Sequence, residues 1–265
     1  MTAAKIFVKS LLILCLSLPL LSKAQDVSSF DKGTYINKKD TLPYRILFPL
    51  DFDATKKYAL IIVLHGAGER GNDNEAQLKY GPKLFLNDTV RIKYPAIVVY
   101  PQCPKNGWWS NTKISQDSAG HYSFQFVEGG DPTPAMQDLL GLLSQLLEKP
   151  YVNKYRVYVG GLSMGGMGTF EILRRRPDVF AAAFAMCGGD NTLNAKAYAK
   201  KVPIWIFHGE KDNVVSPDHS IVMVNAIKAE GGNPKFTLYP NDGHNCWDDA
   251  FAEPGFMAWL FSHKK

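Results

Sequence analysis

Short apolar runs separated by turn-forming residues recur along most of this chain. Ala59–Leu64 and Ala96–Tyr100 are continuously apolar, which is typical of strands buried on both faces. Tyr155–Val159 alternates between polar and apolar residues and is rich in β-formers, so it predicts another strand. Further strands are expected at residues 34–36 and 44–48, which would form an N-terminal hairpin, and at residues 181–186, 203–207 and 235–239.

Segments with helical periodicity lie between these strands. Residues 134–149 carry apolar side chains at helical spacing, and residues 164–176 predict a helix that ends where Pro177 forbids its continuation. Residues 217–229 and 255–261 predict two more helices. Strands that alternate with helices indicate an α/β fold with a mostly parallel central sheet and helices on both faces, and the length fits one domain.

The first residues have the pattern of a secretory signal peptide. Lys5 and Lys9 form a basic region before an apolar run from Leu11 to Leu21, and Ser22-Lys23-Ala24 supplies small residues before a cleavage site. The apolar run is too short for a transmembrane helix. We therefore expect residues 1–24 to be removed and residues 25–265 to form one domain that is periplasmic or secreted.

Composition and charge exclude several classes of partner. Loss of the three leader lysines would lower the formal net charge from +5 to +2, and no basic cluster suggests nucleic acid. No other segment is long enough for stable membrane insertion. Cys103, Cys187 and Cys246 have no metal-ligand spacing, so neither a metal nor another cofactor is expected. The three cysteines that remain after loss of the leader, which contains Cys15, allow at most one intramolecular disulfide, and the sequence leaves the pair and the oligomeric state open.

The pentapeptide Gly161-Leu162-Ser163-Met164-Gly165 joins a predicted strand to a predicted helix. A serine between two glycines at such a junction is the pattern of a nucleophile elbow, because only glycine fits beside so tight a turn. The turn lifts the Ser163 hydroxyl clear of the sheet. It also places the Met164 amide at a helix N-terminus, where the amide can donate to a developing oxyanion.

Candidate partners for this serine follow two later strands. Asp212 lies in the loop after residues 203–207, and His244 follows residues 235–239. The carboxyl ends of parallel strands meet at one edge of a sheet, and Ser163, Asp212, His244 is the chain order of α/β-hydrolase triads. Serine needs a general base, and the base needs a carboxylate to orient it. Asp190 is a rival acid, whereas His208, at a strand end, is expected to be a buried structural group.

A glycine-rich turn, His65-Gly66-Ala67-Gly68-Glu69-Arg70-Gly71, follows the Ala59–Leu64 strand. By position it supplies the second half of an oxyanion hole, with Ala67 as donor beside Met164. A plain strand-to-loop turn is the alternative. Residues 102–133 form a long irregular stretch, and loops of that length are usually functional. Trp108 and Trp109 in this stretch, with Trp247 after His244, are candidates to contact a sugar ring or an aromatic acyl group.

These motifs together resemble those of secreted bacterial α/β-hydrolase esterases. The resemblance covers the chain after the leader and is carried by residues 65–71, 100–103, 160–166, 208–212 and 243–244. The motifs are similar to those of the phospholipase/carboxylesterase and polyhydroxybutyrate-depolymerase-like groups, including relatives of feruloyl and acetyl-xylan esterases. It implies ester hydrolysis through an acyl-enzyme, with Ser163, Asp212 and His244 in the triad positions. Without a propeller or Ig-like domain, a prolyl-oligopeptidase type of peptidase is not expected.

The substrate is left open by the sequence. Export, aromatic residues and the resemblance favour short or aromatic acyl esters of polysaccharides, as in feruloyl and acetyl esterases. Lipid-like esters and polyesters are the alternative substrates, for which residues 102–133 would form a lid rather than a substrate platform. Because a fold does not prove an activity, a carbohydrate- or lipid-binding protein on a hydrolase scaffold is the alternative from another class.

Overall fold

The computed structural model of the chain describes residues 26–37, 40–118, 120 and 122–265. The predicted signal peptide, residues 1–24, lies outside the described residues, so its removal stays a prediction. Among the residues described, no helix is long and apolar enough to cross a bilayer.

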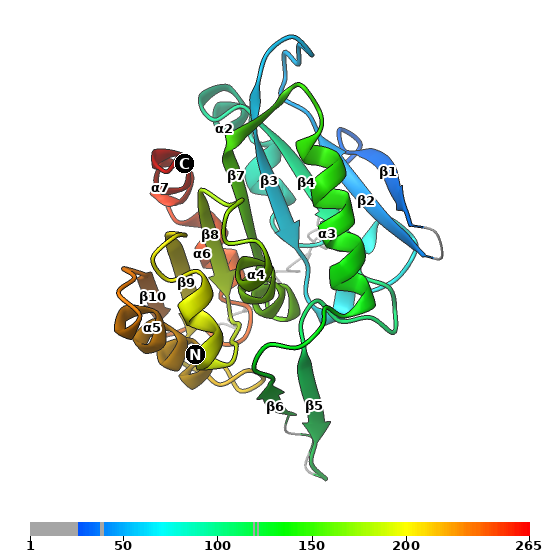
Figure 1. Ribbon diagram of the computed structural model, residues 1–265. Helices are drawn as coiled ribbons and strands as arrows, with labels where there is room; N and C mark the ends of the chain where they lie inside the picture. The colour runs from blue at the N-terminus through cyan, green and yellow to red at the C-terminus, as the bar shows by residue number, and fades with distance from the viewer. Residues whose placement is uncertain (1–25, 38–39, 119, 121) are drawn as a thin grey trace, which may run out of the picture.

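The core of the fold is an eight-stranded sheet in the order β1-β2-β4-β3-β7-β8-β9-β10 (Figure 1). The predicted N-terminal hairpin is present as β1 (Asp31–Ile36) and β2 (Thr41–Leu47), which pair antiparallel, and β2 is also antiparallel to β4. All other pairs are parallel. These parallel strands are β3 (Tyr58–Leu64), β4 (Ala96–Pro101), β7 (Val152–Leu162), β8 (Ala182–Met186), β9 (Ile204–Gly209) and β10 (Lys235–Tyr239).

Both faces of the sheet are buried, which explains the uninterrupted apolar sequence of β3. Leu60, Ile62 and Leu64 belong to one hydrophobic cluster, and the intervening Ala59, Ile61 and Val63 belong to another. The first cluster is completed by α3 (Pro134–Leu147), α4 (Met164–Arg175) and α5 (Asp218–Ala229), and the second by α1 (Pro82–Leu86), α6 (Trp247–Ala252) and α7 (Phe256–Ser262). Full burial of one Leu or Ile side chain stabilises the fold by about 1.5–3 kcal/mol. The predicted α/β architecture is confirmed.

Three short helices were not anticipated from the sequence: α1, α2 (Asp88–Lys93) and α6. Each has six residues or fewer, which is too short for a clear helical period. The expectation that residues 102–133 are irregular is wrong in part, because they contain a separate hairpin, β5 (Thr112–Gln116) and β6 (Tyr122–Phe126). Phe124 and Phe126 of β6 pack edge-on against His219 of α5, with ring centroids 6.1 and 5.2 Å away. These contacts attach the hairpin to the domain.

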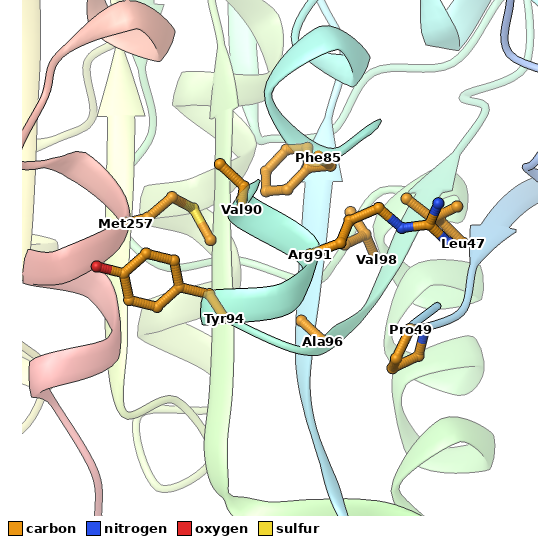
Figure 2. A pocket seen from close by; sticks show the side chains of 9 residues that line it. All are labelled: Leu47, Pro49, Phe85, Val90, Arg91, Tyr94, Ala96, Val98 and Met257. Atoms are coloured by element: carbon orange, nitrogen blue, oxygen red, sulfur yellow. The ribbon is translucent and has the colours of Figure 1, made fainter. Parts of the chain in front are cut away.

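The amino and carboxyl ends of the parallel strands differ in whether they leave room for a ligand. A small cavity lies at the amino end of β4, between α2 and α7, and is lined by residues such as Phe85, Tyr94 and Met257 (Figure 2). Its volume of about 10 Å³ has room for about one water molecule and no ligand. The predicted catalytic residues lie at the opposite end of the strands, in the loops that follow β3, β7, β9 and β10.

Candidate active site

Ser163 occupies the sharp turn between β7 and α4. Its backbone has φ 53° and ψ −117°, a conformation that costs a non-glycine residue about 1–3 kcal/mol and is found mainly at functional sites. The flanking glycines are required by close packing. A Cβ on Gly161 would come within 2.6 Å of the Gly165 carbonyl oxygen, and a Cβ on Gly165 would overlap the Leu64 carbonyl. The nucleophile elbow expected from the sequence is therefore present in geometry.

The three predicted triad residues form one hydrogen-bonded chain. Ser163 Oγ lies 2.9 Å from His244 Nε2, and His244 Nδ1 lies 2.7 Å from Asp212 Oδ2. Both distances are in the range of good hydrogen bonds. Because Asp212 accepts at Nδ1, that nitrogen carries the proton and Nε2 is free to accept the proton of Ser163. The structure thus brings together side chains that are separated by 81 and 32 positions in the sequence.

Asp212 is held as an anion in a buried position. Its second oxygen, Oδ1, accepts the amides of Val214 and Val215, each at 2.9 Å. Burial alone would raise the pKa of Asp212, but hydrogen bonds from His208 and His244 outweigh it and hold that pKa well below its usual range. The carboxylate therefore stays charged near neutral pH and can stabilise an imidazolium at His244.

Asp190, the rival acid, is placed elsewhere. Its Oδ1 accepts from the Asn191 amide at 2.7 Å and from Asn194 Nδ2 at 3.0 Å. Burial raises the pKa of Asp190 to about 7, so this carboxyl group is partly protonated near neutral pH and is a poor orienting anion. The geometry selects Asp212 over Asp190 as the partner of His244.

His208 was expected to be a buried structural residue, and it is fully buried. Its Nε2 lies 3.1 Å from Asp212 Oδ2, and its Nδ1 lies 2.7 Å from Ser220 Oγ. Ser220 in turn donates to the Gly188 carbonyl at 3.0 Å. His208 and Ser220 therefore support Asp212 from behind. The position of His208 four residues before Asp212 was the available signal, whereas Ser220 on α5 carried none.

His244 is mostly buried, and its pKa depends strongly on its neighbours. Burial lowers its pKa, but hydrogen bonds to Asp212 and to the Cys187 sulfur outweigh that effect and raise the pKa to about 9. The Trp247 ring meets the imidazole edge-on, with centroids 5.2 Å apart. His244 is thus fixed from two sides, by the carboxylate and by the tryptophan.

The glycine-rich turn after β3 lies directly against the serine. A Cβ on Gly66 would come 3.7 Å from Ser163 Cβ, and Ala67 lines the same cleft as Ser163. His65 anchors the turn, because its Nε2 accepts the Cys103 amide at 2.9 Å and its Nδ1 donates to the Gly66 carbonyl at 2.7 Å. Burial lowers the pKa of His65 to about 4. The Ala67 and Met164 amides donate to no other described residue, so both are available as oxyanion donors.

Ser163 and His244 open into a cleft of about 510 Å³, a volume in the usual range for small-molecule sites. Its walls are largely aromatic and apolar and include both the turn after β3 and the β5–β6 hairpin. The lining side chains include Tyr80, Trp108, Ile114, Tyr122, Phe124, Met167, Val214 and Trp247. The missed hairpin therefore supplies cleft residues that the sequence did not identify.

The three predicted substrate-contacting tryptophans do not share one role. Trp108 and Trp247 line the cleft. The prediction for Trp109 is wrong, because its side chain is completely buried in the core. Its indole nitrogen donates to the His65 carbonyl at 3.3 Å, and a Cβ on Gly168 would overlap it. Of this adjacent pair, only Trp108 faces the cleft.

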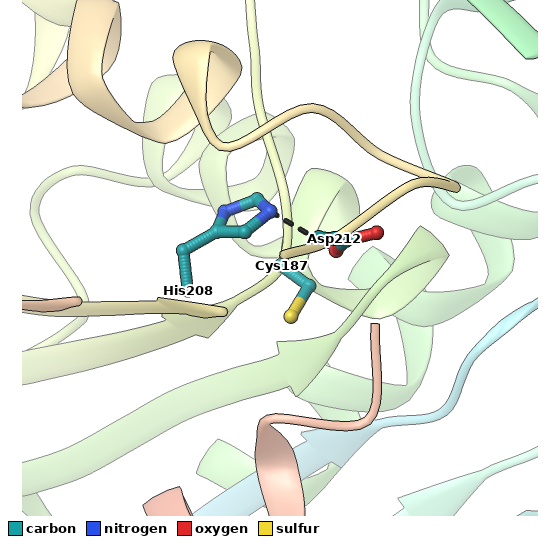
Figure 3. A group of neighbouring side chains, drawn as sticks. All are labelled: Cys187, His208 and Asp212. Carbon is teal, nitrogen blue, oxygen red and sulfur yellow. Dashed lines mark hydrogen bonds and ion pairs between the residues drawn. The ribbon is translucent and has the colours of Figure 1, made fainter. Parts of the chain in front are cut away.

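Cys187, His208 and Asp212 place ligand-type atoms within 4.8 Å of one another, and Figure 3 shows these three side chains gathered together. These atoms already bind one another and their neighbours. His208 Nε2 contacts Asp212 Oδ2 and the Val215 carbonyl, and the Cys187 sulfur contacts Cys246. The cluster is therefore explained as support for the triad without a metal ion.

This architecture is that of the α/β-hydrolases, and the class that its elbow and hydrogen-bonded triad define is the serine hydrolases. The chain belongs to the phospholipase/carboxylesterase family, whose model matches residues 52–253. It is accordingly an enzyme of the carboxylesterase type, as the motifs implied.

Two curated relatives illustrate the range of this family. Lysophospholipase-like protein 1 of Mus musculus is 29% identical over 199 residues, which cover 70% of this chain and 80% of that protein. A bifunctional acetylxylan esterase/xylanase of Neocallimastix patriciarum is 35% identical over 158 residues, which cover 59% of this chain but 20% of that protein.

Solved structures agree with the fold. A thermostable esterase superposes with a TM-score of 0.80 at 30% identity, over 90% of this chain and 64% of that one. A ferulic acid esterase from Anaeromyces mucronatus superposes with a TM-score of 0.60, over 91% of this chain and 93% of that one. At 15% identity the second likeness concerns the fold alone.

Proposed function

We propose that this enzyme hydrolyses carboxylic esters through an acyl-enzyme on Ser163. The observation that carries the proposal is the continuous hydrogen-bond chain from Ser163 Oγ through His244 to Asp212. A free serine hydroxyl is a weak nucleophile, and a neutral imidazole at 2.9 Å removes its proton as attack proceeds. No metal or organic cofactor is needed for this chemistry.

The reaction has two halves. Ser163 Oγ attacks the ester carbonyl while His244 Nε2 takes the hydroxyl proton, and the amides of Ala67 and Met164 stabilise the oxyanion. The tetrahedral intermediate then collapses, the alcohol leaves with the proton from His244, and the acyl group stays on Ser163. Water attacks that acyl-enzyme by the same route and releases the acid. Asp212 keeps the imidazole in the required tautomer throughout.

For the substrate, we propose short or aromatic acyl esters of sugars or polysaccharides. Aromatic side chains line the cleft around Ser163, and aromatic faces suit both a sugar ring and an aromatic acid. The acetylxylan esterase activity in the name of one relative supports the same class. The β5–β6 hairpin serves as a substrate platform in this proposal, and residues Lys113, Ser115 and Gln116 on β5 are exposed and polar.

We also propose that the enzyme is exported to the periplasm or secreted. The support is the basic residues Lys5 and Lys9, the apolar run from Leu11 to Leu21 and the small residues before residue 25. N-terminal sequencing of the protein recovered from the cell exterior or the periplasm tests this. A chain that starts at Met1 would contradict it.

The decisive experiment combines covalent labelling with a substrate panel. A fluorophosphonate probe should label the wild type and not Ser163→Ala, whose fold is checked by circular dichroism. Folded wild-type protein that is not labelled and turns over no ester would instead favour the binding protein. The panel contains acetylated and feruloylated oligosaccharides, aryl esters, triglycerides and polyesters. We expect activity to fall steeply beyond short acyl chains, and preference for long-chain triglycerides would make the hairpin a lid.

A further inference from the structure

The described residues contain a pair of buried cysteines next to the triad. Cys187 follows β8, and Cys246 lies two residues after His244 at the start of α6. Their sulfur atoms are 2.7 Å apart although the residues are 59 positions apart, and both side chains are fully buried. A disulfide has a sulfur–sulfur distance of about 2.04 Å, so only a small adjustment separates the contact from a covalent bond.

The backbone of Cys187, at the end of β8, is held in a fixed position. The Cys187 amide donates to the Phe207 carbonyl at 2.9 Å, which ties it to β9. Its φ of 48° lies in the left-handed region that β-carbon-bearing residues rarely adopt. The next residue, Gly188, is so close to α4 that a Cβ there would lie 2.9 Å from the Met167 amide. A strained residue held this firmly is one whose side-chain direction matters.

On the other side, Cys246 belongs to the loop that carries His244. The Cys246 carbonyl accepts the Ala250 amide at 3.0 Å and begins α6, and Trp247 packs edge-on against the His244 ring. The Cys187 sulfur lies beside the His208–Asp212 pair, and Asp212 binds His244 (Figure 3). A bond between the two sulfurs would therefore join the histidine loop to the strand edge behind the triad.

We propose that Cys187 and Cys246 form a disulfide that positions the His244 loop. The proposal rests on the proposed export, because disulfides persist in oxidising compartments, and its effect on catalysis rests on the proposed hydrolase function. Cys103 remains a thiol. Its amide donates to His65 on the other side of the site, whereas the sulfur atoms of Cys187 and Cys246 contact each other.

The oxidation is a thiol–disulfide exchange with a low-molecular-weight disulfide, such as oxidised glutathione, or with the disulfide of an exported oxidoreductase. One cysteine thiolate attacks the oxidant and forms a mixed disulfide, and its partner thiolate then displaces the second thiol. The two thiols of the chain are oxidised, the sulfur–sulfur bond of the oxidant is reduced to two thiols, and the protons pass to these products. Burial raises the pKa of the Cys187 thiol, so we expect the bond to form before the site closes during folding.

The first test is a peptide map of protein refolded with reduced and oxidised glutathione. The protein is alkylated under denaturing conditions and digested without reductant. We expect one cross-linked peptide pair containing Cys187 and Cys246, with Cys103 alkylated. Folded protein in which Cys187 and Cys246 are both alkylated, or in which Cys103 takes part in the cross-link, would overturn the proposal.

The second test separates an effect of the disulfide on the position of His244 from an effect on stability alone. Dithiothreitol should lower the midpoint of thermal unfolding by roughly 5–10 °C in the wild type. It should also lower kcat on p-nitrophenyl acetate several-fold, with KM little changed, at a temperature well below the unfolding midpoint, because the His244 loop is no longer tied to the end of β8. The Cys103→Ala variant should show both responses, and Cys246→Ala should show neither. A cross-linked protein whose kcat does not change on reduction would overturn the positioning role, whereas a cross-linked protein without labelling at Ser163 would contradict the proposed function and leave the bond standing.

Discussion

His208 and His244 contact the same carboxylate oxygen, Asp212 Oδ2, at 3.1 and 2.7 Å. His244 reaches it from the loop after β10, and His208 reaches it from the end of β9. His208 is fully buried, while His244 borders the cleft. The two imidazoles therefore act differently: one moves protons in the proposed mechanism, and the other fixes the direction of the carboxylate.

The support that His208 gives to Asp212 leads to the first prediction. His208→Gln should lower kcat by up to roughly 100-fold, because a small misplacement of a catalytic group can cost that much. KM for p-nitrophenyl acetate should change little, since His208 does not line the cleft. Steady-state kinetics measure both constants. Ser220→Ala, which removes only the outer contact of His208, is the milder companion variant, and an effect confined to KM would contradict the interpretation.

The assignment of the triad acid can be checked by a matched pair of substitutions. Asp212→Asn should reduce kcat by about 10⁴-fold, because an amide favours the wrong tautomer of His244. Asp190→Asn should leave kcat within a few-fold, since Asp190 binds Asn191 and Asn194 instead of the histidine. If the large loss follows the substitution at Asp190, the wrong strand end has been chosen.

The pH dependence follows from His244. A general base must be neutral, and the pKa of His244 is raised to about 9. We therefore expect kcat/KM to rise with pH from neutrality to near 9, by about tenfold per pH unit on the acidic side. Initial rates on p-nitrophenyl acetate, corrected for spontaneous hydrolysis, give the profile. Asp212→Asn should move its residual ascending limb to lower pH, because the hydrogen bond and charge that raise the pKa are lost.

Much of the fold could be predicted because the strong signals are local. The apolar runs of β3 and β4 and the period of α3 identify buried strands and a long helix without knowledge of tertiary contacts. The β5–β6 hairpin could not be identified in that way. Its stability depends on Phe124 and Phe126 packing against His219 of α5, almost a hundred residues further along the chain.

The same distinction applies to the site. Ser163, Asp212 and His244 were identifiable because parallel topology brings strand ends together in a known order. Trp108 and Trp109 could not be distinguished, because they are neighbouring residues of the same type and the sequence does not show which one faces the cleft. Ser220 was missed because its role depends on a contact with His208 from a different element. Side-chain direction and tertiary partners are the information that a single sequence lacks.

His65 should make the stability of the protein depend on pH. Its pKa is about 4 in the folded state against a usual 6.5, so the unfolded chain binds a proton first as pH falls. Stability is therefore lost between about pH 6.5 and 4, by roughly 3 kcal/mol in total. Asp190, with a pKa raised to about 7, contributes the opposite slope over much of this range. Urea unfolding of wild type and His65→Asn at several pH values measures this. The free energy of unfolding should fall less steeply with decreasing pH in His65→Asn, and equal pH dependence in the two proteins would contradict the prediction.

The two adjacent tryptophans give the final prediction, which concerns the substrate. Trp108 lines the cleft, and the Arg70 guanidinium lies 5.1 Å from its ring centroid. Trp108→Ala should raise KM for feruloylated or acetylated oligosaccharides by about tenfold, consistent with the loss of roughly 1–1.5 kcal/mol of aromatic contact. The KM for p-nitrophenyl acetate should rise less, because that small ester does not need the outer cleft.

Trp109 is the matched control, because it is fully buried and faces the core. Trp109→Phe should lower the free energy of unfolding by a few kcal/mol at most and leave the ratio of the two KM values unchanged. Kinetics on both substrates, with chemical denaturation of each variant, separate binding from stability. A KM that rises equally for both substrates in Trp108→Ala would remove this tryptophan from sugar or aromatic-acyl recognition, and a selective effect in Trp109→Phe would mean that the core residue also shapes the cleft.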